Sequence, residues 1–336
     1  MSTRTIFSVR GGGDPRRMVD LAVQAEEVGF DQIWTGNDIF GEPGLVSLTA
    51  MLYATSRITV GSGVIDPVSI HPAQIAQFAA GLQTFSGGRF VLGLGAGSQV
   101  FFDWAGISPL GPVPRTRNAV RAIRALTRGE SPAALGVGFE DWTAQAVLRQ
   151  PASVPVYVGA MGPKMLAMAG RHADGALPLC LPPRQVFDAR DQILAGARAA
   201  GRDETEIDIA ACLWCAIDDD GDRARYVLAE HIAAYSGSLA EAVLVRHGFD
   251  PEEFARTQSL MLDGRKEDAI GTVLGSSTML TLGIAGGVGD VIDQCVELMS
   301  SGVSHLSFGP PMGQDMHYAM KLLGEKAIPQ LRRESF

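Results

Sequence analysis

Eight short apolar segments typical of strands alternate with longer amphipathic segments along this chain. The predicted strands occupy residues 5–9, 31–35, 57–64, 89–97, 154–160, 174–180, 208–217 and 304–310. The segments between them carry apolar residues at helical spacing, and several end at glycine. Such alternation predicts a parallel sheet flanked by helices, and eight units favour a closed barrel over an open sheet. We therefore expect an α/β fold, a (β/α)8 TIM barrel.

The stretch from about 218 to 285 is mostly helical and does not fit one strand-helix unit. We expect a helical insertion between strands seven and eight, placed to cover the active site or to form a subunit interface. Five apolar residues at helical spacing should pack across a two-fold axis or onto the barrel: Leu228, Ile232, Leu239, Val243 and Leu244. A homodimer is the commonest closed assembly. The 336 residues are expected to form a single domain, because barrels often reach this length.

The charge balance excludes several classes of partner. The formal net charge of −9 argues against general affinity for nucleic acid or for an anionic membrane, since both need a basic face. The first residues lack the apolar core of a signal peptide, and no apolar run is long enough to span a bilayer. These features predict a cytoplasmic enzyme that acts on a small molecule.

The cysteine and glycine motifs argue against a metal site and against a dinucleotide-binding site. Cys212 and Cys215 lie in a predicted strand on opposite faces and lack nearby ligands at metal spacing, so no metal site is expected. The run GLGAGS at 93–98 follows a strand, but Ser98 replaces the last glycine of the dinucleotide fingerprint, and no acidic strand end follows at the required distance. A Rossmann site is therefore not expected, and these glycines could simply let the strand turn out of the barrel.

Several segments together resemble the bacterial luciferase-like superfamily, and within it the F-420-dependent branch, closest to the methylene-tetrahydromethanopterin reductases. The segments are AEEVGFDQIW, GSGVIDP, HPAQIAQFAAGLQTFSGGRFVLGLGAG, FDWAGI, PVYVGAMGPKMLAMAGRHADGAL and GPPMGQDMHYAMKLLGE. They run from the first strand to the last helix, so the resemblance covers nearly the whole chain. It implies a TIM barrel whose active site lies at the carboxyl ends of the strands.

The resemblance also implies positions for the cofactor F-420, an 8-hydroxy-5-deazaflavin. A non-prolyl cis peptide at Gly63-Val64 would buttress the ring, and Asp38 matches an acidic position beside it, although Ile39 stands where histidine is usual. The loop from Gly159 to Pro163 would hold the phosphodiester. The expected cofactor contacts are Asp38, Gly63, Val64, Ile65, Gly95, Gly97, Ser98, Gly159, Ala160, Met161, Gly162 and Pro163.

Two departures from the similar reductases concern the proton donor. Those enzymes carry carboxylates at the positions of Ser8 and Ser98, and a serine hydroxyl cannot replace a carboxylic acid tuned by burial. The remaining acid/base candidates near the strand ends are Asp14, Asp38, Asp66, His71 and Asp103. Asp66 directly follows the expected bulge, so it is either a general acid or a turn-forming residue before Pro67. His71 is better explained as the start of a helix.

The sequence thus predicts an F-420-dependent oxidoreductase that moves a hydride between the deazaflavin and a C=N or activated C=C group. The candidate catalytic residues are Asp66, Asp38, Ser8 and Ser98. One alternative is an FMN-dependent monooxygenase of the same superfamily, because the fold hosts both chemistries. The other is a non-catalytic flavin-binding homologue, suggested by the absence of both carboxylates.

Overall fold

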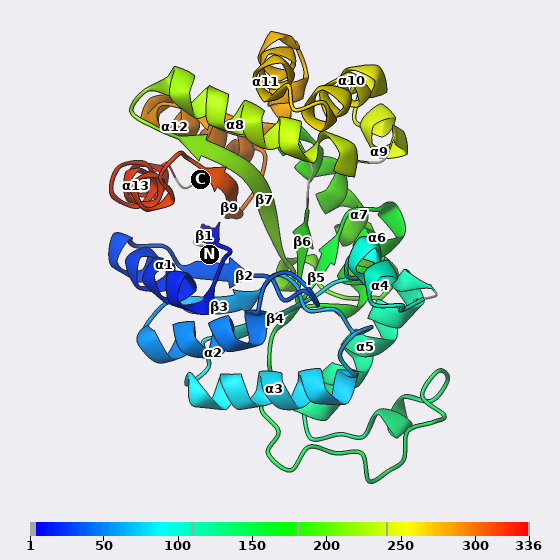
Figure 1. Ribbon diagram of the computed structural model, residues 1–336. Helices are drawn as coiled ribbons and strands as arrows, with labels where there is room; N and C mark the ends of the chain where they lie inside the picture. Colours follow the sequence, from blue (N-terminus) through cyan, green and yellow to red (C-terminus); the bar gives the residue numbers. More distant parts are fainter. Residues whose placement is uncertain (1–4, 109–110, 180–181, 240, 335–336) are drawn as a thin grey trace. The chain divides into compact units, whose positions relative to one another are not determined.

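A computed structural model describes residues 5–108, 111–179, 182–239 and 241–334. The strands are β1 (Ile6–Arg10), β2 (Gln32–Thr35), β3 (Thr59–Ser62), β4 (Phe90–Leu94), β5 (Val156–Ala160), β6 (Gly175–Pro178), β7 (Asp208–Ile217), β8 (Gly283–Gly286) and β9 (His305–Met312) (Figure 1). Among the described strands, β1 to β7 and β9 form a closed ring because β6 also pairs with β7, and β8 is added beside β7. The predicted (β/α)8 TIM barrel is therefore confirmed. Of the predicted sixth strand, Cys180 lies outside the described residues.

The helices follow the predicted alternation. They are α1 (Pro15–Val28), α2 (Gly44–Ala54), α3 (Pro72–Phe85), α4 (Gln99–Trp104), α5 (Pro112–Thr127), α6 (Pro163–His172), α7 (Val186–Ala199), α8 (Gly221–Tyr235), α9 (Glu241–Arg246), α10 (Pro251–Leu262), α11 (Lys266–Gly275), α12 (Val288–Ser300), α13 (Met316–Lys321), a π-helical turn (Leu322–Ala327) and α14 (Ile328–Leu331). None of the helices in the described ranges is long and apolar enough to cross a membrane.

Contacts divide the chain into two compact units. Unit 1 comprises Met1–Phe7, Cys180–Phe187 and Ala211–Phe336, and unit 2 comprises Ser8–Leu179 and Asp188–Ala210. Strands β1 and β7 each contribute residues to both units. The single domain expected from the length of the chain stays a prediction.

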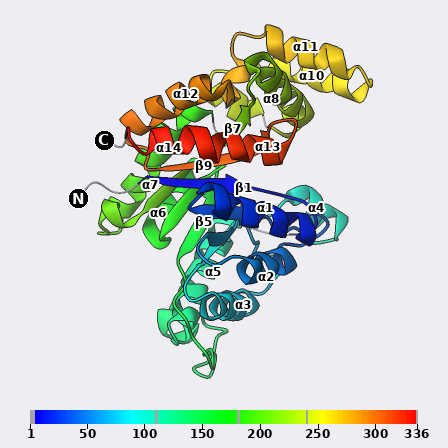
Figure 2. The same cartoon turned by 90° about the vertical axis from the view of Figure 1, so that its left-hand side faces the viewer.

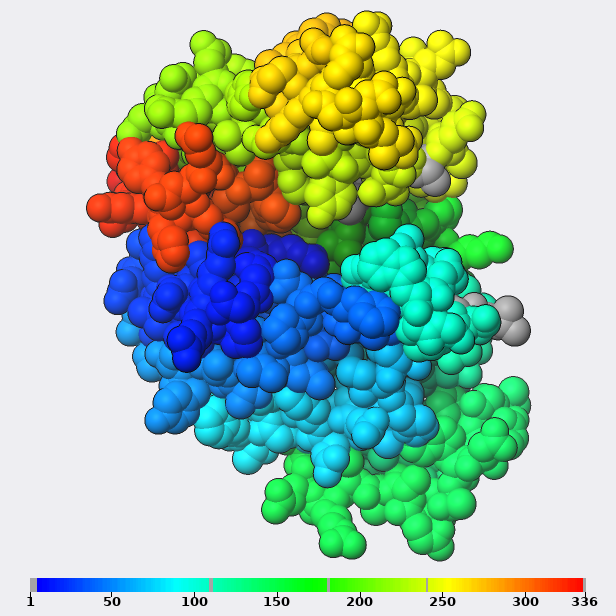
Figure 3. All heavy atoms as spheres, viewed as in Figure 1, coloured from blue at the N-terminus to red at the C-terminus, as the bar shows by residue number. Residues whose placement is uncertain are grey.

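Unit 2 holds a run of neighbouring parallel strands. Each strand from β1 to β6 pairs with the next, and β6 pairs with the first residues of β7. Helix α1 packs beside α2, and α5 packs beside both α3 and α6 (Figures 1 and 2). Residues 128–155, between α5 and β5, form the green lobe at the lower edge of this unit in Figure 3. Because the paired strands of this unit are parallel, their carboxyl ends lie at one edge of the unit.

In unit 1, helices α8 to α11 lie between β7 and β8 in the sequence, with α8, α10 and α11 packed together (Figure 2). Leu228, Ile232 and Leu244 are at most 3% exposed and belong to one apolar cluster with Trp214 of β7 and Phe254. These side chains are thus covered within the unit and do not need a second subunit to bury them.

Two elements have no counterpart in the sequence-based expectations. Strand β8 has only four residues, GIAG, and it pairs in parallel with the end of β7. So short a glycine-containing segment carries no alternation that would predict a strand. Helix α4 has six residues and directly follows the glycines after β4. Its length, less than two turns, is too short for helical periodicity to be recognised.

Candidate active site

The segment that follows β3 forms the centre of the candidate site in unit 2. The peptide bond between Gly63 and Val64 is cis. Hydrogen bonds hold this segment to both neighbouring strands: Gly63 N donates to Thr35 O at 2.7 Å, and Ile65 N donates to Gly93 O at 2.9 Å. The position of the Val64 side chain is therefore determined by β2 on one side and β4 on the other.

Glycines at the ends of β4 and β5 make room for Val64. A Cβ atom placed on Gly95 would overlap Val64 Cγ2, and one placed on Gly159 would lie 2.9 Å from Val64 Cγ1. Real Cβ atoms do not approach other heavy atoms so closely. Gly61 has a similar role within β3, because a Cβ there would overlap the indole ring of Trp34. The glycines that interrupt these strands are thus explained by close packing around the cis-bonded segment.

Asp38 lies half-buried beside this segment, on the loop between β2 and α2. A Cβ placed on Gly36 would lie 3.5 Å from Asp38 Oδ2 and 3.8 Å from Arg10 Nη2, which puts both charged groups next to this glycine. Burial raises the pKa of the Asp38 carboxyl; the Arg10 guanidinium opposes that rise, while the carboxylates of Asp66 and Glu42 add to it. The surroundings of Asp38 therefore shift the pKa of its carboxyl upward, in the direction of the protonated form.

Glu42 holds the loops around Asp38 in place. Its Oε2 accepts a hydrogen bond from Gly13 N at 2.8 Å, and its carbonyl oxygen accepts one from Asp38 N at 3.2 Å. The loop after β1 and the loop after β2 are thereby joined. Arg10 and Glu42 were not among the predicted site residues. Arg10 could have been found because it ends the first strand, whereas Glu42 carried no signal in the sequence.

Asp66 is 4% exposed, and its carboxylate is occupied by its own turn. Oδ1 accepts hydrogen bonds from Val68 N at 2.9 Å and Ser69 N at 2.6 Å, and Oδ2 accepts one from Ser69 Oγ at 2.6 Å. Such a pattern is typical of an aspartate that stabilises a turn. The geometry therefore favours the turn-forming role, and the acid role of Asp66 stays a prediction.

The two serines at the positions of the expected carboxylates differ in their surroundings. Ser8 is fully buried within β1. Ser98 is half-buried and is the N-cap residue of α4, where its side chain makes no capping hydrogen bond. Both residues lie in unit 2, but only Ser98 has a solvent-accessible side chain.

The other acid/base candidates have local structural roles. Asp14 caps α1 by accepting hydrogen bonds from Arg16 N and Arg17 N. His71 is the N-cap residue of α3, as the sequence predicted, and its Nδ1 accepts a hydrogen bond from Ala73 N at 3.2 Å. Asp103 accepts a hydrogen bond from Gln99 Nε2 at 2.7 Å. These three side chains therefore have local structural explanations.

The loop after β5 can receive an anion. Gly162 is the N-cap residue of α6, makes no side-chain capping bond, and has open space where a Cβ would point. Backbone N–H groups at the start of a ten-residue helix attract negative charge. Lys164, exposed in the first turn of α6, adds a positive charge that the predicted contact set did not include. Its position directly after Gly-Pro at a helix start is the signal that could have identified it.

An exposed aromatic group borders Asp38. Phe40, Phe101 and Trp104 have ring centroids 5.3 to 6.3 Å apart. Phe40 is 55% exposed and Trp104 is 66% exposed, so the group presents a broad apolar surface. A Cβ on Gly41 would lie 3.2 Å from Asp38 Cβ and 3.5 Å from a ring carbon of Phe101. Asp38 and the aromatic group therefore meet at this glycine.

Comparison with known proteins finds luciferase-like proteins as relatives over almost the entire chain. A family model described as luciferase-like monooxygenase matches residues 3–305. The 5,10-methylenetetrahydromethanopterin reductase of Methanolobus tindarius is 33% identical over 312 residues, which cover 93% of this chain and 95% of the relative. The enzyme of that name from Archaeoglobus fulgidus is 33% identical over 311 residues, with 92% and 93% coverage.

A solved structure resembles this chain equally widely. The coenzyme F-420 dependent tetrahydromethanopterin reductase from Methanopyrus kandleri superposes with a TM-score of 0.87 at 29% sequence identity, covering 98% of this chain and 99% of its own. Because the family model matches well over half of the residues, this protein belongs to the luciferase-like monooxygenase family.

Proposed function

We propose that this protein transfers a hydride between F-420 and a C=N or activated C=C group of a small molecule. Its similarity to the reductases supports the class, an F-420-dependent oxidoreductase. The observation that carries the finer proposal is the half-buried Asp38, whose pKa is raised beside the Gly63-Val64 segment. F-420 supplies the hydride when it is bound, and the protein supplies orientation and protons.

The residues of unit 2 fit this cofactor. The open start of α6 with Lys164 suits its phosphodiester, and Val64 offers an apolar side chain against which a flat ring can rest. Gly95 and Gly97, which follow β4, extend the surface on which the ring would rest, and Ser98 is the next residue in the chain. The predicted contacts at Ile65, Ala160, Met161 and Pro163 belong to the same two segments. We therefore keep the whole predicted contact set in the proposal and add Arg10 and Lys164.

In this proposal, Asp38 is the proton donor. Reduction of a C=N group requires a proton on nitrogen, and a carboxyl with a raised pKa can hold that proton nearer to neutral pH. Arg10 opposes the rise in the Asp38 pKa, so it limits the protonated fraction of this carboxyl. Asp66, Ser8 and Ser98 remain candidates, but Asp66 already uses both oxygens in its turn.

Cofactor titration tests this proposal. We expect F-420 to bind at least ten times more tightly than FMN, a difference of about 1.4 kcal/mol. Lys164→Gln should weaken F-420 binding, whereas Arg171→Gln, which removes a charge from the last turn of α6, should leave it unchanged. Equal or reversed affinities, together with oxygen consumption in the presence of reduced FMN, would establish the monooxygenase alternative. Tight F-420 binding without turnover of any imine or enoyl compound would establish the non-catalytic one.

The homodimer is also a proposal. Because Leu228, Ile232 and Leu244 are buried within unit 1, an interface would have to use other residues. Sedimentation at micromolar concentration measures the assembly directly. A monomer under those conditions would contradict it.

A further inference from the structure

A cavity lies in unit 2, between the turn after β3, the start of α5 and the lobe at residues 128–155. Its volume is about 710 Å3. Cavities of roughly 300 to 1,000 Å3 are typical of small-molecule sites. Val68, His71, Arg115, Asn118, Gly138 and Trp142 are among the residues that line it. None of these residues belongs to the site proposed for F-420.

A smaller cavity of about 220 Å3 adjoins it. Val68 and Arg115 line both cavities, so the two spaces meet at these side chains. The smaller one also borders Gly97, which follows β4. Arg115 therefore borders both cavities, which are together called the hollow below.

The charges around this hollow favour an anion. The chain carries 37 acidic residues, yet no aspartate or glutamate is among the described residues that line either cavity. Within the described ranges, the Arg115 guanidinium has no ion pair. An exposed guanidinium with no carboxylate among the described lining residues attracts negative charge. Asn118 adds a donor, because its Oδ1 accepts from Arg117 Nε at 3.0 Å and its Nδ2 remains available.

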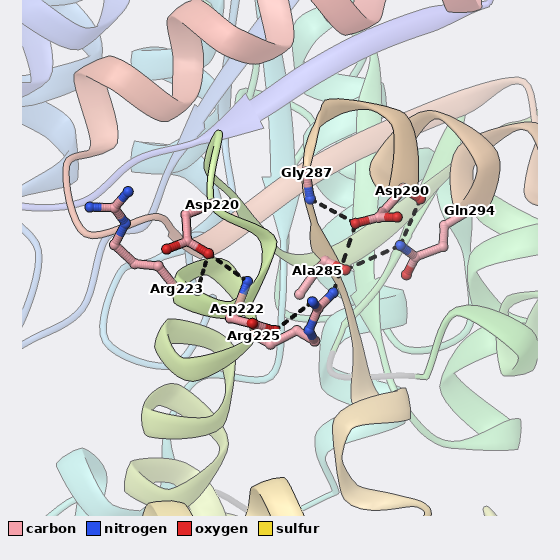
Figure 4. A network of polar contacts seen from close by, with 8 residues as sticks. All are labelled: Asp220, Asp222, Arg223, Arg225, Ala285, Gly287, Asp290 and Gln294. Atoms are coloured by element: carbon pink, nitrogen blue, oxygen red, sulfur yellow. Dashed lines mark hydrogen bonds and ion pairs between the residues drawn. The ribbon is translucent and has the colours of Figure 1, made fainter.

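Arg225 in unit 1 shows the opposite situation. It also lines a cavity, of about 390 Å3. Its Nη2 lies 2.7 Å from Asp222 Oδ1, and its Nη1 lies 3.8 Å from Asp290 Oδ2 (Figure 4). Asp290 in turn accepts a hydrogen bond from Gly287 N at the start of α12. The charge of Arg225 is thus satisfied within the protein, whereas that of Arg115 is available to a ligand.

An aromatic surface lies along the same hollow. The rings of His71 and Trp142 have centroids 5.5 Å apart and an interplanar angle of 33°. The loop that carries Trp142 is held in place: Trp142 N donates to Phe139 O at 3.0 Å, and the Arg121 guanidinium lies 4.9 Å from the Phe139 ring centre. A planar ring can pack against this fixed surface.

We propose that this hollow is a second binding site, for an organic anion that carries an aromatic ring. The anionic group contacts Arg115 and Asn118, and the ring packs against Trp142 and His71. A guanidinium suits a phosphate or carboxylate because its planar donors match two oxygens at once. The larger cavity shares no lining residue with the proposed F-420 contact set, whereas the smaller one borders it at Gly97.

Calorimetric titration of the full chain with phenyl phosphate tests the charged contact. We expect Arg115→Gln to weaken binding at least tenfold and Arg128→Gln to leave it unchanged. The two arginines are matched, since both are exposed, and Arg128 is the C-cap residue at the far end of α5. Equal weakening in both variants would show a general charge effect and overturn the proposal. So would the absence of binding to the unmodified protein at millimolar phenyl phosphate.

Two further titrations locate the ligand. Trp142→Ala should reduce the affinity for phenyl phosphate to that for inorganic phosphate, because the ring then has no surface to pack against. Lys164→Gln should leave phenyl phosphate binding unchanged. If Lys164→Gln weakens binding as much as Arg115→Gln, the anion sits at the α6 loop and the proposal is wrong. Circular dichroism of each variant verifies that it is folded.

Discussion

The side chain of Val64 occupies the space that any side chain at Gly95 would need. These residues come from the segment after β3 and the end of β4, which are also joined by the hydrogen bond from Gly95 N to Ile65 O at 3.0 Å. The backbone contact and the steric contact together bring the two segments as close as they can approach. The surface proposed to support the cofactor therefore depends on a glycine at position 95.

Gly95→Ala should lower the free energy of unfolding by about 1 to 3 kcal/mol, as for overpacked sites, and should weaken F-420 binding. Gly81→Ala in α3 is the matched control. A Cβ there meets nothing within 4 Å, so it should stabilise the protein by up to about 1 kcal/mol. Chemical denaturation measures both values. Adding Val64→Ala should restore part of the stability lost at position 95, and no recovery would contradict the steric explanation.

Asp38→Asn should slow hydride transfer to a neutral imine by roughly 10²-fold or more, the range for general acid catalysis. F-420 affinity is measured alongside the rate, because Asp38 is also one of the proposed cofactor contacts. Because the acid form of Asp38 is the active one, the rate for the unmodified protein should fall as pH rises through the raised pKa of this carboxyl. Single-turnover rates at several pH values measure this dependence. A variant with the same rate and the same pH profile would remove Asp38 from the mechanism.

Asp66→Asn should act on stability rather than on chemistry. The variant loses the carboxylate charge that strengthens three hydrogen bonds in the turn. This loss should lower the free energy of unfolding by about 1 to 3 kcal/mol. The single-turnover rate should stay close to that of the unmodified protein. A large loss of rate with unchanged stability would instead support Asp66 as the general acid.

Glu26→Ala should destabilise the junction between α2 and β3 by about 1 to 3 kcal/mol at neutral pH. Burial raises the Glu26 pKa, but hydrogen bonds from the N–H groups of Ile58, Arg57 and Ser56 outweigh it and lower the pKa from 4.5 to about 2. A lowered pKa in the folded state means that this stabilisation is present above pH 4.5 and is lost as pH falls towards 2.

The difference in free energy of unfolding between Glu26→Ala and the unmodified protein should therefore shrink over that pH range. Glu27→Ala, a change at the neighbouring exposed carboxylate, is the control and should have little effect at any pH. A difference that does not vary between pH 7 and pH 2 would show that the carboxylate charge is not responsible.

The sequence alone determined the barrel, because strand and helix periodicities are local properties that repeat eight times. It also located the start of α3 at His71 and the glycines after β3, β4 and β5, since backbone requirements are visible in residue type. Strand β8 and helix α4 were not predicted because each is too short for a periodic pattern.

The roles of the charged residues were decided only by the tertiary structure. Asp38 and Asp66 have the same side chain and both follow strands, yet Asp66 is occupied by its own turn whereas Asp38 is half-buried beside Arg10. The roles of Glu42 and Arg115 likewise depend on groups that are distant in the sequence. Burial, pKa shifts and unpaired charges depend on which segments pack against one another. Local residue patterns do not determine that packing.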